Sequence, residues 1–295
     1  MTGKPMRDRA AILRRGFGGR RPKLQRRRAA KAAAAALCAA AVLGAWTPIA
    51  VSAVSGEKKQ KPPYYPDRFD LTYYLDGQGR KHPVKTVEDW AKRRAHILAN
   101  AQLVMGPLPG KEKKVPPDVK VLKTWESPLV TFKKITYAAE KGDHVPAYLL
   151  VPKNLKGKAP AVLCLHWTDR ANGALKLISG GRAYARELAK RGYVTIAPDN
   201  VYSGENKSDP YKLGYKSGTM KAIWNHMRAV DLLQSLPEVD GERIGSIGFS
   251  LGGHSSVFLA AFDPRVKAVV TGAGLGPIMR LCADKGNQYT VRVWK

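Results

Sequence analysis

The chain has 295 residues, enough for one sizeable domain or two small ones with a hydrophobic core. Its hydrophobic fraction of 44% and charged fraction of 25% exclude wholesale disorder, and its three cysteines exclude a disulfide scaffold. The formal net charge of +28 is unusual. Net charge alone bears on solubility and non-specific binding, and it does not indicate a fold or a reaction. Nucleic-acid binding is therefore only an alternative, and we expect no nucleic-acid partner.

Residues 1–53 read as an export signal. Residues 1–31 hold twelve basic side chains and one acidic side chain, and residues 32–56 hold no charged side chain. A basic segment followed by an apolar stretch and small residues is typical of a secretory signal peptide.

We expect cleavage after Ala53 and export to the periplasm or the extracellular space. The sequence Arg-Arg-Gly-Phe at 14–17 resembles the core of a twin-arginine signal. The alternative is an N-terminal membrane anchor, because 25 uncharged residues could span a bilayer. After cleavage we expect no stable membrane insertion.

Residues 54–125 are predicted to form a linker and an N-terminal helical extension. Lys, Pro and Tyr dominate residues 54–70, which read as a linker or surface strap. A helix is predicted from Thr86, a plausible N-cap, to Met105, and a loop rich in Lys and Pro follows at 110–118.

From about residue 128 the pattern changes to short apolar runs that alternate with helical segments. The strand-like runs are 129–138, 145–151, 161–166, 193–197, 244–249 and 266–271, and the helical segments are 181–191, 218–236 and 251–262. This alternation predicts a mostly parallel sheet with helices on both faces. The first two runs are close enough in sequence to form an antiparallel hairpin.

The chemistry-bearing motif is Gly248-Phe249-Ser250-Leu251-Gly252, which matches G-x-S-x-G. A predicted strand enters it and a predicted helix leaves it, as this motif requires. Ser250 must sit in a strained turn, and Gly248 and Gly252 remove side chains that would collide there. The alternative is an ordinary Gly-rich strand-to-helix turn.

A second element of the site is expected where the run at 161–166 ends. The backbone N–H of Leu251 and that of Trp167 or Thr168 would form an oxyanion hole. His166 could orient this loop in the pocket, or merely terminate the strand.

The chain resembles the α/β-hydrolase superfamily, in particular dienelactone hydrolase-like and acetylxylan esterase-like secreted esterases. The resemblance runs from about Trp90 to Gly274 and includes VPAYLLVPKNLKGKAPAVLCLH, YARELAKRGYVTIAPD and GFSLGGH. It implies hydrolysis of an ester, often an acyl group on carbohydrate, with Ser250 as the nucleophile. The enzyme named for dienelactone uses a cysteine at that position, so the esterase side of the group fits better.

The sequence departs from this family after the motif. The superfamily order is nucleophile, acid, histidine, yet the last histidine is His254, which a helix would hold away from the position of the base. Asp263 is predicted to lie at the wrong end of the sheet, and Asp284 lies in a tail that does not resemble the family. We therefore assign no triad acid or histidine, and place Asp199 in the pocket.

We expect an incomplete α/β-hydrolase domain at 126–274 that lacks its last strands, followed by a divergent tail at 275–295. Truncation or a frameshift near Gly274 would explain it, and the expected result is an inactive or impaired secreted carboxylesterase. The substrate would be a small ester or an acylated carbohydrate, and no metal, cofactor or disulfide is expected. The alternatives are a non-catalytic basic binding protein, a pseudo-hydrolase completed by a partner, and a peptidase.

Overall fold

The computed structural model describes residues 61–274, which belong to one compact unit, Gln60–Lys295. The predicted export signal at 1–53 and the predicted tail at 275–295, with Asp284, lie outside the described residues. Within the described part, no helix is long and apolar enough to cross a membrane.

The described residues form nine strands, four α-helices and two short 3₁₀ helices. The strands are β1 (Tyr73–Leu75), β2 (Lys81–Pro83), β3 (Lys120–Glu126), β4 (Val130–Glu140), β5 (Asp143–Pro152), β6 (Ala159–Leu165), β7 (Val194–Pro198), β8 (Val239–Phe249) and β9 (Val266–Gly272). The helices are α1 (Val87–Met105), η1 (Lys111–Lys113), η2 (Gly173–Leu177), α2 (Tyr184–Lys190), α3 (Gly218–Ser235) and α4 (Leu251–Phe262).

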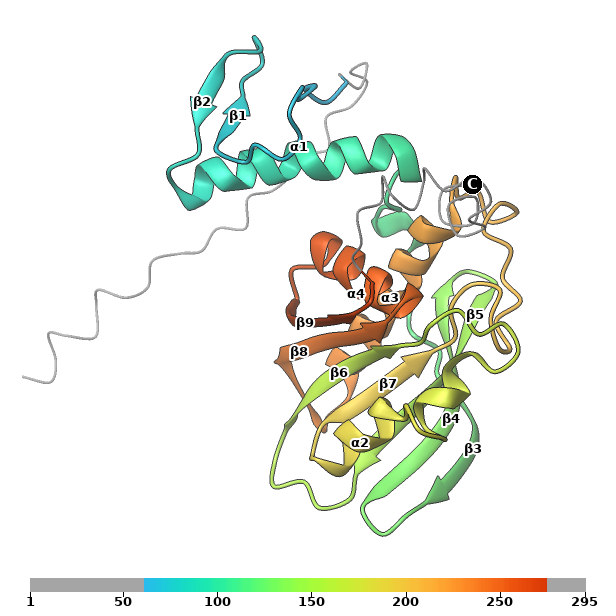
Figure 1. The fold of residues 1–295 in the computed structure, drawn as a ribbon. Helices are drawn as coiled ribbons and strands as arrows, with labels where there is room; N and C mark the ends of the chain where they lie inside the picture. Colours follow the sequence, from blue (N-terminus) through green and yellow to red (C-terminus); the bar gives the residue numbers. More distant parts are fainter. Residues whose placement is uncertain (1–60, 275–295) are drawn as a thin grey trace, which may run out of the picture. The chain divides into compact units, whose positions relative to one another are not determined.

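A mixed seven-stranded sheet organises the fold, in the order β3-β4-β5-β7-β6-β8-β9 (Figure 1). Strands β7, β6, β8 and β9 pair in parallel, whereas β3, β4 and β5 pair antiparallel, and β5 also runs antiparallel to β7. The predicted parallel sheet with an N-terminal hairpin is confirmed. The six predicted strand-like runs after residue 126 correspond to β4 to β9, with differences at their ends, and the three predicted helical segments correspond to α2, α3 and α4.

Helices cover both faces of this sheet, as predicted. One core layer packs α3 and α4 against the sheet through residues such as Ile223, Leu233 and Leu259. The other packs α2 and η2 through Leu177, Ala185 and Ala189. All five residues of β7 are buried, as expected for a strand covered on both faces.

Cys164 lies in the central strand β6 and is fully buried as a free cysteine. Burial raises the pKa of its thiol, because the thiolate would lose its hydration.

Strand β3 is an element that the sequence pattern did not reveal. Its seven residues, KVLKTWE, are exposed except for half-buried Trp125, so they lack the apolar alternation of a covered strand. β3 is an edge strand, and lysines on an edge discourage pairing with other chains. The sheet therefore begins at Lys120, within the segment assigned to the N-terminal extension.

Helix α1 confirms the predicted helix from Thr86 to Met105. The Thr86 side chain accepts a hydrogen bond from the Asp89 amide, and the Asp89 carboxylate accepts from the Thr86 amide. At the other end, the Ser217 hydroxyl donates to the Met105 carbonyl at 2.7 Å. Ser217 also caps α3, so one side chain joins the end of α1 to the start of α3.

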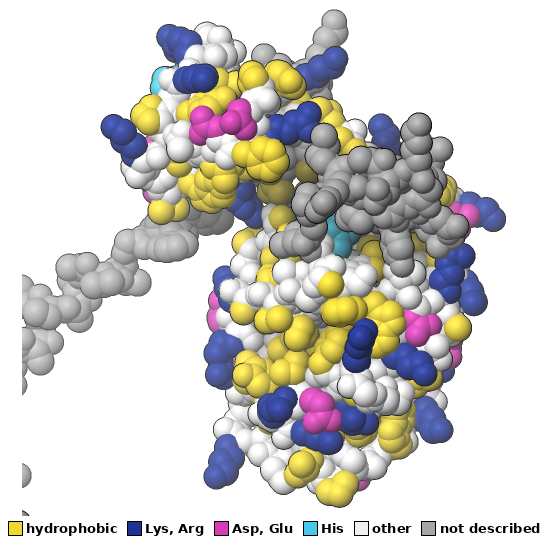
Figure 2. All heavy atoms as spheres, in the orientation of Figure 1, with side chains coloured by type: hydrophobic (Ala, Val, Ile, Leu, Met, Phe, Trp, Pro, Cys, Tyr) yellow, Lys and Arg dark blue, Asp and Glu magenta, His cyan; other side chains and the backbone are white. Residues whose placement is uncertain are grey.

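On the face shown in Figure 2, lysine and arginine side chains are scattered between exposed hydrophobic side chains. At the β9 edge of the sheet, Val270 is 58% exposed. The second side of β9 pairs with no strand among residues 61–274.

His226, on α3, provides a test of how burial controls stability. Its ring is fully buried, its Nδ1 atom has no hydrogen-bond partner among the described residues, and burial lowers its pKa to about 3. An unfolded imidazole binds a proton near pH 6.5. The free energy of unfolding should therefore fall as pH is lowered from about 6.5 towards 3, by up to about 1.4 kcal/mol per pH unit for this group.

We expect His226→Leu to lose this part of the pH dependence in urea unfolding measured at pH 7 and pH 5. Met220→Leu, a non-titrating substitution at another buried position on α3, is the control and should keep it. Equal pH slopes in wild type and His226→Leu would contradict the assignment.

Candidate active site

Ser250 lies between β8 and α4, at the turn that the sequence motif predicts. Its backbone has φ 54° and ψ −118°, a conformation that L-residues other than glycine rarely adopt. The turn is held by a 2.7 Å hydrogen bond from the Ser250 amide to the Gly272 carbonyl of β9. Strain of this kind persists only where the surroundings impose it, and it is common at catalytic sites.

The two glycines of the motif leave no room for a side chain. A Cβ atom on Gly248 would lie 2.1 Å from the backbone of Gly252. A Cβ atom on Gly252 would lie 1.9 Å from the Leu165 carbonyl oxygen and 2.8 Å from that of His166. The first turn of α4 therefore packs directly on the end of β6.

This close approach brings together the two segments that were expected to form the oxyanion hole. Leu251 is the first residue of α4, and Trp167 and Thr168 directly follow β6. Trp167 is half-buried and Thr168 is exposed. The N-terminus of α4 adds the favourable end of its dipole for a developing negative charge.

His166 is a buried connector between two loops. Its Nε2 atom accepts a hydrogen bond from the Asn200 amide at 3.0 Å, so the proton of the neutral ring is on Nδ1, which lies against the Trp167 carbonyl oxygen. Burial lowers the pKa of His166, so the ring stays neutral. Both nitrogens are occupied, which prevents this ring from serving as the base for Ser250.

Asp199 is buried behind the loop that follows β7. One carboxylate oxygen accepts from the Ala174 amide at 2.7 Å, and the other accepts from the Glu205 amide at 2.8 Å. Burial raises the pKa of Asp199, although the two amide hydrogen bonds act against this rise. Asp199 thus fixes the loop behind the pocket, and its side chain does not line the cavity.

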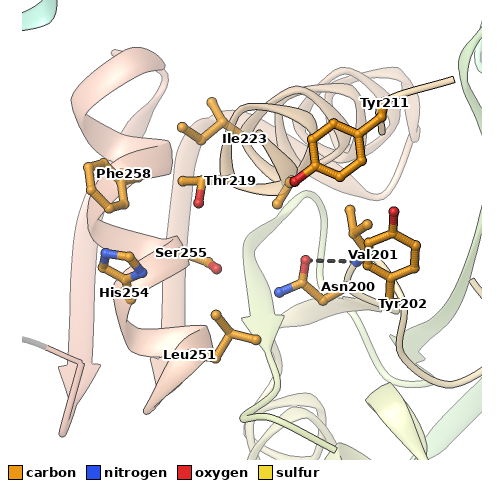
Figure 3. Close-up of a pocket in the computed structure, with 12 residues that line it drawn as sticks. Asn200, Val201, Tyr202, Tyr211, Thr219, Ile223, Leu251, His254, Ser255 and Phe258 are labelled. Carbon is orange, nitrogen blue, oxygen red and sulfur yellow. Dashed lines mark hydrogen bonds between the residues drawn. The ribbon is translucent and has the colours of Figure 1, made fainter. Parts of the chain in front are cut away.

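A cavity of about 110 Å³ lies beside Leu251, between α4, the first turns of α3 and the 200–211 loop (Figure 3). Its apolar and aromatic walls come from side chains on all three segments: Val201, Tyr202, Tyr211, Ile223, Leu251 and Phe258. Asn200, Thr219 and Ser255 add polar groups, and the Asn200 Oδ1 atom accepts from the Val201 amide at 2.8 Å. A mostly apolar cavity with a few polar groups is the usual form of a small-molecule site.

His254 also lines this cavity, and within residues 61–274 its ring makes no hydrogen bond to the Ser250 hydroxyl. Its ring packs edge-on against Phe258, with the ring centroids 4.5 Å apart, and burial lowers its pKa. Within residues 61–274, no side chain hydrogen-bonds to the Ser250 hydroxyl. Asp263, at the far end of α4, forms ion-paired hydrogen bonds with Arg265, away from the nucleophile as predicted.

A buried ion cluster, which the sequence analysis missed, holds the loop that lines the cavity. The fully buried Lys221 ammonium group contacts Glu140 at 2.7 Å and Asp143 at 2.6 Å. The Tyr215 hydroxyl donates to Glu140 at 2.8 Å, and the Ser208 hydroxyl donates to Asp143. The only sequence signal was a lysine within an otherwise apolar stretch of a predicted helix.

Charges in this cluster are matched. Burial opposes ionisation of Glu140, but hydrogen bonds from Lys113 and Lys221 outweigh it and lower the pKa of Glu140. Since Ser208 and Tyr215 belong to the segment between β7 and α3, the cluster fixes that segment against the β4–β5 turn.

A mixed sheet covered by helices, with a strained serine between a strand and a helix, defines an α/β-hydrolase. The chain belongs to the dienelactone hydrolase family, whose family model matches residues 145–293.

The chain is also similar in sequence to an uncharacterized bacterial protein. The uncharacterized protein PA2218 of Pseudomonas aeruginosa is 38% identical over 143 residues, which cover 48% of this chain and 36% of that protein. The chain thus spans about a third of the length of this relative.

Solved structures of esterases share the fold. A glucuronoyl esterase from Solibacter usitatus matches with a TM-score of 0.54 and 22% identity, covering 71% of this chain and 64% of that one. A putative acetyl xylan esterase from Bacteroides fragilis matches with a TM-score of 0.50 and 17% identity, covering 70% of this chain and 64% of that one. At these identities the likeness concerns the fold alone.

The contact between α4 and β6 gives a prediction about stability. Gly252→Ala should lower the free energy of unfolding by more than about 2 kcal/mol, because the new methyl group meets rigid backbone rather than a movable side chain. Gly181→Ala is the matched control, since a Cβ atom there meets nothing within 4 Å. Urea unfolding of both variants checks this, and equal stabilities would contradict it.

The buried ion cluster around Lys221 gives another prediction about stability. Lys221→Met should cost about 3–5 kcal/mol of stability, because it leaves two buried carboxylates without their shared cation. Adding Glu140→Gln and Asp143→Asn to this variant removes both charges and should recover most of the loss. If the single and triple variants unfold at the same urea concentration, the loss does not come from unpaired charge.

Proposed function

We propose that this protein is a serine ester hydrolase that acts through an acyl-enzyme on Ser250. The observation that carries the proposal is the strained backbone of Ser250, held at the start of α4 by two glycines that admit no side chain. Membership of the dienelactone hydrolase family supports ester chemistry.

In the proposed reaction, the Ser250 oxygen attacks the ester carbonyl carbon while the hydroxyl proton passes to a water molecule. The Leu251 amide, together with that of Trp167 or Thr168, stabilises the negative charge on the tetrahedral oxygen. The carbon–oxygen bond to the alcohol then breaks, the alcohol leaves with a proton, and water releases the acyl group from Ser250 by the same steps.

We propose a neutral ester as the substrate. Among the twelve described residues that line the cavity there is no Lys, Arg, Asp or Glu, and burial keeps His254 uncharged. A carboxylate in the bound part of the substrate would lose its hydration there without gaining a cation. A small neutral ester or an acylated carbohydrate therefore suits the cavity better than an ester or lactone that carries a carboxylate.

We further propose that the 295-residue chain is a slow esterase, exported by its N-terminal segment 1–53. No histidine follows His254 within the 295 residues, and no histidine of the described part hydrogen-bonds to the Ser250 hydroxyl. Without such a base, the remaining rate comes from binding and the oxyanion hole, which in other serine hydrolases gives roughly 10³–10⁴-fold over water.

Turnover of p-nitrophenyl acetate tests the role of Ser250. Wild type should release p-nitrophenol faster than buffer but well below about 1 per second, and mass spectrometry should find one acetyl group on Ser250. Ser250→Ala should lose both the excess rate and the acetyl adduct. Ser235→Ala, an exposed serine at the end of α3 that does not line the cavity, is the control and should keep both.

The result that would overturn the proposal is an unchanged rate in Ser250→Ala. Turnover at an ordinary enzymatic rate that needs Ser250 would instead support the nucleophile and refute the proposed lack of a base.

A further inference from the structure

A second cavity, of about 200 Å³, lies further along α3 than the candidate active site. Its walls come from the 109–114 loop, α3 from Trp224 to Asp231, and Arg265 after α4. No residue lines both cavities, although their α3 residues are neighbours at Ile223 and Trp224.

Four cationic side chains line this second cavity, namely Lys111, Lys114, Arg228 and Arg265. The only carboxylate in the lining is Asp231, which is mostly buried. Lys114 contacts it at 3.2 Å, and both guanidinium groups contact it as well. Three cations therefore share one carboxylate, so positive charge is in excess.

The neighbouring carboxylates relieve this excess only in part. Asp263 pairs with Arg265 at 2.6 Å but contacts neither Arg228 nor the two lysines. Glu112 turns its carboxylate to the Gly110 amide at 3.1 Å. Burial, followed by the charges of Arg228 and Arg265, lowers the pKa of Lys114, which is the response of an ammonium group to excess positive charge.

Two donor groups of the cluster, one buried and one exposed to solvent, have no protein acceptor within residues 61–274. The buried Nε atom of Arg228, a residue only 2% exposed, has no hydrogen-bond partner in the described part of the chain. Lys111 forms no ion pair within residues 61–274 and is exposed at the rim of the cavity. Buried charged donors without acceptors are costly, which favours an anion in their neighbourhood.

We propose that this cavity is a binding site for a small, doubly charged oxyanion of the phosphate or sulfate class. Lys111 and Lys114 would hold its outer oxygens as mobile cations, and the guanidinium groups of Arg228 and Arg265 would supply the fixed positive field beneath it. The volume admits one tetrahedral anion with some water. The site is independent of ester hydrolysis at Ser250.

Calorimetric titration of the full chain with sodium phosphate, at constant ionic strength set by sodium chloride, tests the proposal. Wild type should bind phosphate saturably, with one site, below about 10 mM. Lys111→Met with Lys114→Met should weaken this binding by roughly tenfold or more, because two charge-assisted contacts are lost. Both lysines are exposed, so their replacement leaves the core unchanged.

Lys156→Met with Lys158→Met is the matched control, since it removes the same charge from another exposed loop. This variant should bind phosphate like wild type. Sulfate should bind in the same range, and acetate, with a single charge, at least about tenfold more weakly.

Several outcomes would overturn the proposal. They are no saturable phosphate binding by wild type, an equal loss in the two lysine variants, or acetate binding as tight as that of phosphate. An equal loss would show that net charge alone attracts the anion. Tight acetate binding would show that the cations attract any anion and do not select a doubly charged one. None of these results depends on esterase activity, so the proposed function is tested separately.

Discussion

The close contact between the first turn of α4 and the end of β6 is the constraint on which the rest of the site depends. With Gly252 against the Leu165 carbonyl, the helix cannot move away from the sheet without opening a gap, nor move closer. Ser250 is therefore pressed into a left-handed backbone conformation, and the amides after β6 and at the start of α4 become neighbours. The chemistry proposed for this protein is a consequence of packing two backbones without intervening side chains.

Buried polar side chains behind the cavity hold the segments that line it. Asp199, His166 and the Lys221 cluster do not touch the cavity, yet each fixes a segment that lines it. Their hydrogen bonds go mainly to backbone amides or to one another, so a loop without regular secondary structure gains a defined shape. The polar interior of this protein thus serves to shape the binding surface, while apolar layers on both faces hold the sheet.

The sequence predicted the elements whose residues are buried in a regular pattern. Strands β4 to β9, the helices α2, α3 and α4 and the Ser250 turn were all visible, because apolar runs and glycine spacing reflect local packing. Strand β3 was missed since an exposed, lysine-rich edge strand has no apolar face to display. The partners of Lys221 could not be predicted either, because Glu140 and Asp143 lie about eighty residues away in sequence and meet it only through the sheet topology. The roles of His166 and Asp199 as connectors likewise depend on amides that tertiary structure brings to them.

Cys164 has a practical consequence for studying this fold. Its thiol lies at zero exposure in the central strand β6, between β7 and β8, and burial keeps it protonated. A thiol reagent can reach it only when the strands around β6 separate, so the labelling rate of this residue reports how often the sheet opens at its centre. The labelling rate of Cys164 therefore measures the local opening of β6, the strand against which the first turn of α4 packs.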